Sequence, residues 1–329
     1  MERNQKVVVI GGGTGLAVLL KGLKKYDLDI TAIVTVSDDG GSSGRLRSDM
    51  GMLPPGDIRN CLVALADTES LMDRVFQYRF RHGEGIEGHN LGNLLIAALT
   101  EISGGFVSAI EEVSRVLKVR GRVLPATLES IELQARMVDG SIINGETAIR
   151  AHPAGIDQIT LLPEKCMPVP ASLRAIKQAD YIILGPGSLY TSIIPNLLVR
   201  GVSEAIIETS ATKIYVNNIM TEKGETDDFD TLQHLQVIQQ YIAQPFIDYV
   251  IVNSGGIDNE RLLRYWQEEA RPVRQNVEEL CRLGFKVLAR DLVAQDRVAW
   301  HDSEKLASAI MEIAEWKQAN DHQERGMAK

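Results

Sequence analysis

The chain has 329 residues, of which 44% are hydrophobic, and Lys+Arg 35 against Asp+Glu 44 give a formal net charge of -9. This acidic balance argues against non-specific binding of nucleic acid, although it allows a small anionic ligand held by local groups. The apolar runs stop short of the ~18 residues that a membrane helix needs, and the 3 cysteines have no CxxC spacing. We therefore expect no membrane span, no disulfides and no cysteine metal site, with no signal peptide before Val7 and a cytoplasmic location.

The first predicted unit is a strand, a glycine turn and a helix. Val7 to Ile10 is a continuous apolar run typical of a buried parallel strand, and the glycine-rich turn GGGTG follows it directly. Glycines at this place let a phosphate approach the free N–H groups of the helix that begins near Leu16. The sequence thus predicts a nucleotide-binding turn, with Gly12, Gly13, Thr14 and Gly15 as its candidate residues.

An acidic pair follows the next predicted strand, Ile30 to Val36. Asp38 and Asp39 stand at its carboxyl end, where a doubly wound sheet places its ligands. The pair could contact a ribose, hold a divalent metal such as Mg²⁺ together with a diphosphate, or act as a general base. These three roles stay open at this point, and the two aspartates are the catalytic candidates.

The segment Gly40 to Gly56 is glycine-rich and ends in two prolines, which predicts a mobile or ligand-ordered loop rather than a regular element. Four polar residues in this loop are candidate phosphate or carboxylate contacts, namely Ser42, Ser43, Arg45 and Arg47. Asp57 is expected to cap a helix over Ile58 to Ala66.

A second helical unit opens at Asn90 and runs through Leu99. Asn90 and Asn93 lie about one turn apart, and we regard helix capping and ligand contact as equally good interpretations. His82 and His89 stand at loop–helix junctions, where histidines are more often structural.

The hydrophobic period becomes alternating between Val119 and Leu162. Ile131 to Met137 alternates apolar with polar residues, and Asp139-Gly140 predicts a tight turn into Ser141 to Ile143. We expect a β-hairpin insertion, and none of its residues forms a chemical pattern.

A second glycine turn follows the buried strand Tyr181 to Leu184. The sequence GPGSLYTS places glycines and hydroxyls between this strand and a helix from Ile193. Ser and Thr often cap helices, but two such turns at strand ends favour a phosphate or carboxylate site. Its candidate residues are Gly185, Gly187, Ser188 and Thr191.

The remaining chain continues the βα pattern. Asn217 and Asn218 follow the predicted strand Lys213 to Val216, and Tyr265 lies in a predicted helix, Arg261 to Glu269. These three residues are further nucleotide-binding candidates. The other predicted elements are a helix from Asp230 to Ala243, strands from Tyr249 to Val252 and from Lys286 to Val293, and a final helix capped by Asp302.

Together these patterns predict an α/β fold. We expect a Rossmann-like three-layer sandwich with a mainly parallel sheet, plus an inserted helical and β-hairpin region. One domain would cover 1–320, with its nucleotide-binding core from 5–40 and 171–300, an insertion over 41–170, and a frayed tail over 321–329.

Two common phosphate motifs do not match. A dinucleotide fingerprint that starts at Gly11 needs glycine where the chain has Leu16, and no Walker lysine follows the turn. The acidic pair nevertheless resembles the ribose-binding carboxylate of nicotinamide enzymes. Binding of NAD therefore remains an alternative.

Several longer motifs carry a resemblance to a known family. The chain resembles the YvcK family of bacterial proteins, often called gluconeogenesis factors, which is similar in fold to the CofD transferases. The motifs are GGGTG, TVSDDGGSSGRLR, PPGDIRN, GHNLGNL, GPGSLYTSIIPNLLV and NNIMTEKGETDDF.

The resemblance implies a cytoplasmic protein that binds UDP-N-acetylglucosamine and supports cell shape and growth on gluconeogenic carbon sources. It implies nucleotide contacts at the two glycine turns, Asp38, Asp39, Asn90, Asn93, Asn217 and Asn218, with Tyr265 as a candidate for the sugar nucleotide. Protein partners would be a kinase or cell-envelope proteins, and we expect a homo-oligomer.

The resemblance also leaves a second activity open. A CofD-like transferase would move a phospholactyl or phosphoenolpyruvyl group from a nucleotide diphosphate donor, with Asp38 or Asp39 holding Mg²⁺ or activating the acceptor. Around Gly40 to Gly51 the chain departs from those transferases, because it is rich in glycine and serine there.

Overall fold

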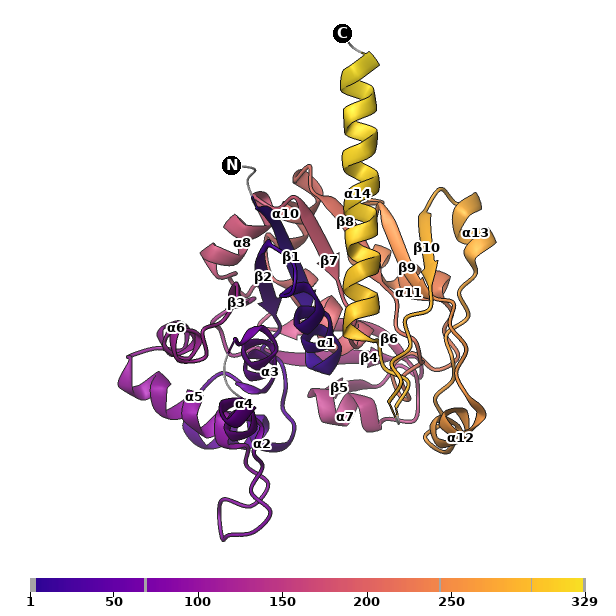
Figure 1. Cartoon of the computed structure of the whole chain (residues 1–329). Helices are drawn as coiled ribbons and strands as arrows, with labels where there is room; N and C mark the ends of the chain where they lie inside the picture. Colours follow the sequence, from indigo (N-terminus) through magenta and orange to yellow (C-terminus); the bar gives the residue numbers. More distant parts are fainter. Residues whose placement is uncertain (1–3, 68–69, 243, 297, 328–329) are drawn as a thin grey trace.

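The computed structural model describes residues 4–67, 70–242, 244–296 and 298–327. Its centre is a seven-stranded sheet in the order β10-β9-β8-β7-β1-β2-β3, in which every neighbouring pair is parallel (Figure 1). The strands are β1 (Gln5–Gly11), β2 (Leu28–Val34), β3 (Arg122–Pro125), β7 (Tyr181–Leu184), β8 (Thr212–Val216), β9 (Tyr249–Asn253) and β10 (Lys286–Arg290).

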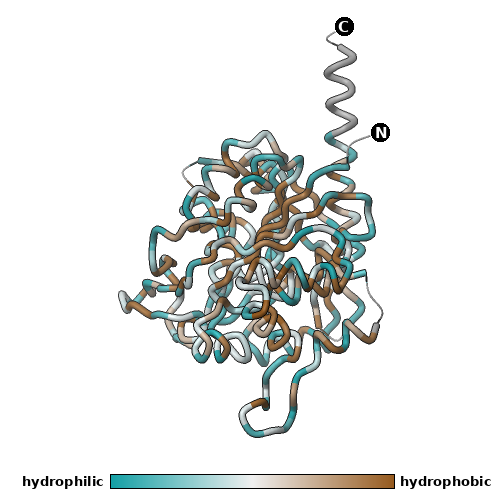
Figure 2. Tube along the Cα trace, turned by 90° about the vertical axis from the view of Figure 1, so that its left-hand side faces the viewer, coloured by the Kyte–Doolittle hydropathy of each residue, from teal (hydrophilic) through white to brown (hydrophobic). Residues whose placement is uncertain are grey.

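The central strands are buried on both faces, as their continuous apolar runs predict. All four residues of β7 and the last five residues of β1 are buried. Figure 2 shows these strands as hydrophobic segments in the middle of the molecule. Burial of both faces is what requires helices on each side of the sheet.

Helices flank the sheet and complete the predicted α/β sandwich. In one group α1 (Gly13–Leu23) packs against α3 (Gly56–Leu65) and α14 (Ser303–Met327), and in another α10 (Val202–Glu208) packs against α8 (Pro170–Lys177) and α9 (Ile194–Leu198). The other helices are α4 (Ser70–Gln77), α5 (Leu91–Ile102), α6 (Phe106–Val116), α11 (Thr231–Gln240), α12 (Asn259–Gln267) and α13 (Val277–Arg282), and a π-helical turn, η1 (Leu189–Ile193), precedes α9. The Rossmann-like fold class predicted from sequence is confirmed.

A small antiparallel sheet, β5-β4-β6, contains the predicted hairpin. In it β4 (Glu132–Met137) pairs with β5 (Ile142–Asn144) and with β6 (Ile156–Leu162), and α7 (Glu146–Ala151) lies between β5 and β6 in the chain. However, β3 lies within the predicted insertion 41–170 and forms the edge strand of the large sheet beside β2. The segment 41–170 therefore contributes to the core sheet as well as to the inserted region.

The prediction of a mobile or ligand-ordered loop over Gly40 to Gly56 is wrong. Residues Gly41–Met50 form helix α2, which ends at Gly51 in the left-handed conformation. Its weak intrinsic propensity is overcome by packing, because Ser42, Ser43 and Leu46 are buried. Tertiary contacts thus fold a polar, glycine-rich segment that sequence propensity alone leaves irregular.

The last described element is the long helix α14, which includes most of the predicted frayed tail over 321–329. Helix α14 continues to Met327, and only Ala328 and Lys329 of the predicted tail lie outside the described residues, as does Ala243 at the predicted end of α11. In the described part of the chain no helix is long and apolar enough to cross a membrane.

Candidate functional site

The order of the strands brings the two glycine turns together. Strands β2 and β3 continue the sheet on one side of β1, whereas β7 to β10 continue it on the other side. The sheet order therefore reverses between β1 and β7, and ligands of open α/β sheets bind outside the carboxyl ends of the strands at this kind of position. The turns that follow β1 and β7 are the two glycine turns predicted from the sequence.

The two turns touch through their backbones. A Cβ atom at Gly15 would lie 2.7 Å from the carbonyl oxygen of Pro186, and one at Gly187 would lie 3.1 Å from the carbonyl oxygen of Gly12. Gly187 also has a φ of 158°, which side chains rarely adopt. Glycine is thus required for the contact that joins the two turns.

A cleft of about 420 Å³ opens above this contact. It lies within the size range of small-molecule sites in proteins. Of the residues predicted from sequence, eight line it: Gly13, Thr14, Gly15, Asp38, Gly187, Ser188, Asn218 and Tyr265. Ser192, another hydroxyl expected in the second turn, lines it as well, and so do polar residues that the sequence did not indicate as ligand contacts, namely Asp57, Glu146, Arg150, Glu222 and His301.

The N-terminus of α1 faces this cleft, and a carboxylate already occupies part of it. The N–H of Gly13 donates a hydrogen bond of 2.7 Å to Oδ2 of Asp57. Asp57 was expected to cap its own helix, but α3 begins at Gly56, so Asp57 lies in its first turn and reaches α1 instead. The first-turn amides of Thr14 and Gly15 have no acceptor four residues earlier in the helix, which leaves them for a ligand.

Burial raises the pKa of two carboxyl groups that line the cleft, those of Asp57 and Glu146. Burial, and then the nearby charge of Asp38, raise the pKa of Asp57 to about 6, although the Gly13 amide opposes the shift. Burial and the charges of Asp38 and Glu225 raise the pKa of Glu146 to about 9. At neutral pH Glu146 therefore carries a proton that it can donate in a hydrogen bond.

Two more glutamates sit behind the second glycine turn. Burial raises the pKa of Glu222 and, with the charge of Glu222 added, raises that of Glu225 to about 8. Arg150 is the cation that lines the cleft, and its Nε lies 3.4 Å from Oε1 of Glu225. One arginine thus faces several carboxyl groups, and its charge only partly opposes the burial that raises the pKa of Glu146, Glu222 and Glu225.

Hydrogen bonds to these two glutamates stabilise the second turn. The Ser188 hydroxyl donates to Oε2 of Glu222 at 2.5 Å, and Nδ2 of Asn218 donates to Oε1 of Glu222 at 3.0 Å. Asn218 also exchanges two hydrogen bonds with the backbone of Gly187, one from its Nδ2 and one to its Oδ1. Thr191 lies behind this layer, where its hydroxyl donates to Glu225 at 3.0 Å.

The two aspartates of the acidic pair point to different places. Asp38 lines the cleft and accepts a hydrogen bond from the N–H of Gly40. Asp39 instead accepts from the N–H and the hydroxyl of Thr147, at 3.0 and 2.6 Å, at the start of α7. The pair therefore does not present both carboxylates to one ligand, and across the described residues no group of three or more His, Cys, Asp or Glu side chains is arranged to hold a metal ion.

His301 places an unused acceptor at the cleft. It is buried, and burial lowers its pKa to about 4, so the ring is neutral. One ring nitrogen bonds to the backbone of Asn217, whereas Nε2 is buried without a partner among the described residues. Because the bonded nitrogen, Nδ1, carries the proton, Nε2 can accept a hydrogen bond from a ligand. Aromatic rings of Tyr265 and Trp300 lie in the same wall.

The remaining candidates support the site rather than line it. Asn217 is buried and bonds to Tyr215 and Thr231. Gly12 lies beneath the cleft, where a Cβ would be 2.8 Å from Asp57, and Gly185 forms the turn after β7 with a φ of 78°.

The polar residues of α2 and α5 bind one another. Asn90 caps α5 by accepting from the N–H of Asn93, which agrees with the capping interpretation, and Asn90 and Asn93 donate to the Ser42 hydroxyl from N–H and Nδ2 respectively. Arg45 and Arg47 donate to the carbonyl groups of Glu87 and Ile131. None of these α2 side chains lines the cleft.

Comparisons with known proteins place this architecture in a family. The family described as 2-phospho-L-lactate transferase CofD matches residues 7–293. The chain belongs to the CofD family. The match covers both glycine turns and nearly all of the cleft wall, which confirms the family resemblance carried by the sequence motifs.

Relatives within this family carry the name gluconeogenesis factor. The protein of that name from Bacillus subtilis is 47% identical over 95% of this chain and 99% of its own length, and that from Halalkalibacterium halodurans is 47% identical over 94% and 97%. A solved member of the UPF0052 family from Bacillus halodurans has a TM-score of 0.91 and 45% identity, covering 94% of this chain and 100% of its own. The chain thus groups with the gluconeogenesis factors by sequence and by fold.

The residues that sequence reasoning missed fall into two classes. Asp57 and Glu222 stand inside motifs that carried the family resemblance, PPGDIRN and NNIMTEKGETDDF, so the signal was present but assigned to capping and to a loop. Glu146 and Arg150 come from α7, in the region where no chemical pattern was expected. Only the tertiary fold brings α7 to the carboxyl edge of the large sheet.

Proposed function

We propose that the protein is a cytoplasmic regulatory protein that binds UDP-N-acetylglucosamine in the cleft between the two glycine turns. In this role it would support cell shape and growth on gluconeogenic carbon sources. The chain would act as a homo-oligomer, and ligand binding in the cleft would change its interaction with a cell-envelope protein or a kinase.

The observation that carries the proposal is the meeting of two glycine turns at the point where the sheet order reverses. The first-turn amides of α1 offer hydrogen-bond donors for a diphosphate, and the side chain of Arg150 adds one positive charge. The neutral Glu146 and the free Nε2 of His301 suit the hydroxyl and amide groups of a sugar or a base.

Isothermal titration calorimetry with a panel of nucleotides tests this proposal. We expect heat of binding with UDP-N-acetylglucosamine, weaker binding with UDP alone, and none with N-acetylglucosamine alone. The panel includes NAD, because the acidic residue Asp38 at the end of the second strand resembles the ribose contact of nicotinamide enzymes. Binding of NAD or another nucleotide, with no heat from UDP-sugars, would refute the assignment of the ligand.

A second candidate function is a transferase that acts on a nucleotide diphosphate donor. The observation in its favour is Asp57, whose pKa near 6 suits a general base at neutral pH, beside Asp38 in the same cleft. Both groups face the turn whose amides would stabilise a leaving diphosphate. The resemblance to the CofD transferases suggests a phospholactyl or phosphoenolpyruvyl donor and Mg²⁺, with Asp38 as the candidate ligand of the ion.

Turnover of the donor separates the two functions. If the protein is a transferase, Asp57→Asn should lower the turnover rate about 100-fold or more while the donor still binds. If the bound nucleotide stays intact over hours, with and without an added acceptor, the transferase function is refuted and only the regulatory function remains.

A further inference from the structure

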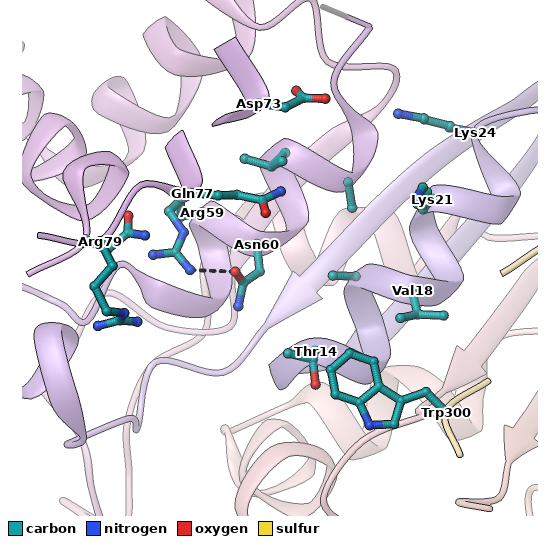
Figure 3. A pocket seen from close by; sticks show the side chains of 14 residues that line it. Thr14, Val18, Lys21, Lys24, Arg59, Asn60, Asp73, Gln77, Arg79 and Trp300 are labelled. Carbon is teal, nitrogen blue, oxygen red and sulfur yellow. Dashed lines mark hydrogen bonds between the residues drawn. The ribbon is translucent and has the colours of Figure 1, made fainter. Parts of the chain in front are cut away.

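A second cavity adjoins the cleft on the other side of α1. It has a volume of about 380 Å³ and shares Thr14, Val18 and Trp300 with the cleft (Figure 3). Its far wall comes from α3, α4 and the residues that follow α4. The two spaces are thus neighbours that share part of one wall, whereas the rest of their linings differs.

The lining of this second cavity is basic. It contains Lys21, Lys24, Arg59 and Arg79, against Asp73 as its one carboxylate. In the part of the chain that the structure describes, none of the four cations forms an ion pair with a carboxylate within 4.0 Å. Figure 3 shows the side chains of Arg59 and Arg79 close together at one end of the cavity.

Arg59 is the deepest of these cations. It is 8% exposed, and its Nη1 and Nη2 donate to the side chains of Asn93 and Asn60 at 2.8 and 2.6 Å. Its Nε is buried without a partner among the described residues. Burial and the nearby charge of Arg79 lower the pKa of Arg59 to about 10, so it still carries its charge at neutral pH.

A buried guanidinium beside a second arginine is costly unless an anion compensates it. Asn60 and Asn93 hold the Arg59 fork in place but supply no negative charge, and the more distant charges of Asp57 and Asp38 offset only part of the lowering of its pKa. The other two cations, Lys21 and Lys24, come from the last turns of α1, on the same side of the cavity as each other in Figure 3. The protein thus holds positive charge around an open space of small-ligand size.

We propose that this basic cavity is a second ligand site, which binds the phosphate group of a small phosphorylated metabolite next to the nucleotide cleft. Lysine and arginine around one volume suit a phosphate dianion, because guanidinium and ammonium donors make charge-assisted hydrogen bonds to its oxygens. The four cations of the site do not line the cleft, so the two spaces offer a ligand different charged groups.

Calorimetry with glycerol 3-phosphate as the probe tests the site, and succinate serves as a dicarboxylate probe of the same charge. We expect glycerol 3-phosphate to bind, and Lys21→Gln and Arg79→Gln each to weaken it roughly tenfold, since each removes a charge-assisted contact. Both side chains are exposed, so these variants should fold. Arg74→Gln is the matched control, because Arg74 is an exposed arginine of α4 that does not line the cavity.

Four results would overturn the proposal: no binding of glycerol 3-phosphate, succinate binding as tightly, an equal loss in Arg74→Gln, or no loss in Lys21→Gln and Arg79→Gln. A further titration is made with saturating UDP-N-acetylglucosamine. The phosphate probe should still bind, whereas its displacement would assign the cavity to the nucleotide's own site. Failure of UDP-N-acetylglucosamine to bind in its separate titration would refute the proposed function without affecting the basic cavity.

Discussion

The nucleotide cleft and the basic cavity share one wall but have opposite chemistry. The cleft gathers Asp38, Asp57, Glu146 and Glu222 with one arginine, whereas the cavity gathers four cations with one aspartate. In the cleft burial keeps Glu146 protonated at neutral pH, and in the cavity Arg59 keeps its charge although it is buried. Helix α1 therefore separates a site that would hold anions through backbone amides from one that would hold them through side-chain charge.

The largest expected effect comes from the contact between the two glycine turns. In Gly15→Ala the new methyl group would lie 2.7 Å from the Pro186 carbonyl, so one turn must move. We expect UDP-N-acetylglucosamine affinity to fall about 100-fold or more and the free energy of unfolding to fall by about 1–3 kcal/mol. Calorimetry and urea denaturation measure the two effects.

Gly105→Ala is the control for this change, because a Cβ at Gly105 meets nothing within 4 Å. Glycerol 3-phosphate should bind Gly15→Ala nearly as well as the unaltered chain if the basic cavity is a separate site. Unchanged affinity of Gly15→Ala for UDP-N-acetylglucosamine would show that the nucleotide does not contact the joined turns.

The next largest expected effect is on the pH dependence of stability, and it comes from Glu146, the protonated glutamate of the cleft. The pKa of Glu146 in the folded state is about 9, above the 4.5 of an unperturbed glutamate. Between pH 4.5 and pH 9 the folded protein therefore binds more protons at Glu146 than the unfolded chain does. The contribution of Glu146 to the free energy of unfolding is fully present below pH 4.5 and is lost as the pH rises towards 9. Glu146→Gln should remove this loss, on the order of 3 kcal/mol between pH 5 and pH 8.

Urea denaturation of both proteins at several pH values checks this prediction. Glu101→Gln, the same change at an exposed glutamate of α5, should keep the pH dependence of the unaltered chain. Parallel stability curves for Glu146→Gln and the unaltered chain would contradict the raised pKa.

A smaller effect is expected from the single cation of the cleft. Arg150→Gln should weaken UDP-N-acetylglucosamine roughly tenfold, because it removes one charge-assisted contact to the diphosphate. Arg282→Gln, at an exposed arginine of α13, should have no effect. Equal affinities for Arg150→Gln and Arg282→Gln would place the diphosphate away from Arg150.

The smallest effect tests whether the two regions are independent. Lys21→Gln alters the basic cavity only, so it should change UDP-N-acetylglucosamine affinity by less than about twofold at 0.15 M salt, where exposed charges are screened. A tenfold loss in the same calorimetric titration would mean that one ligand spans both regions.

Local pattern was enough to predict the fold class and eight of the residues that line the cleft. Apolar runs and glycine turns mark β1 and β7 directly, and the strand ends locate Asp38 and Ser188. The sequence could not show that Asp39 turns away to α7, since that depends on where the inserted sheet docks. For the same reason Glu146 and Arg150 gave no signal. They lie well over 100 residues after the first glycine turn in the sequence, and only the tertiary fold brings the two segments together.

The basic cavity was equally hidden from sequence reasoning. Lys21 and Lys24 look like an ordinary solvated end of α1, and Arg59 looks like a surface residue of an amphipathic helix. Its burial at 8% exposure follows from the packing of α3 against α5 and from the bond to Asn93. Charge that is buried without a carboxylate partner is visible only in three dimensions.

Hydrogen–deuterium exchange with and without UDP-N-acetylglucosamine tests the central claim most directly. The account predicts that ligand slows exchange in peptides covering residues 11–16 and 185–192, where the amides of the two joined turns would bind the diphosphate. Protection confined to residues 59–60 and 77–79, or absent from both glycine turns, would contradict it.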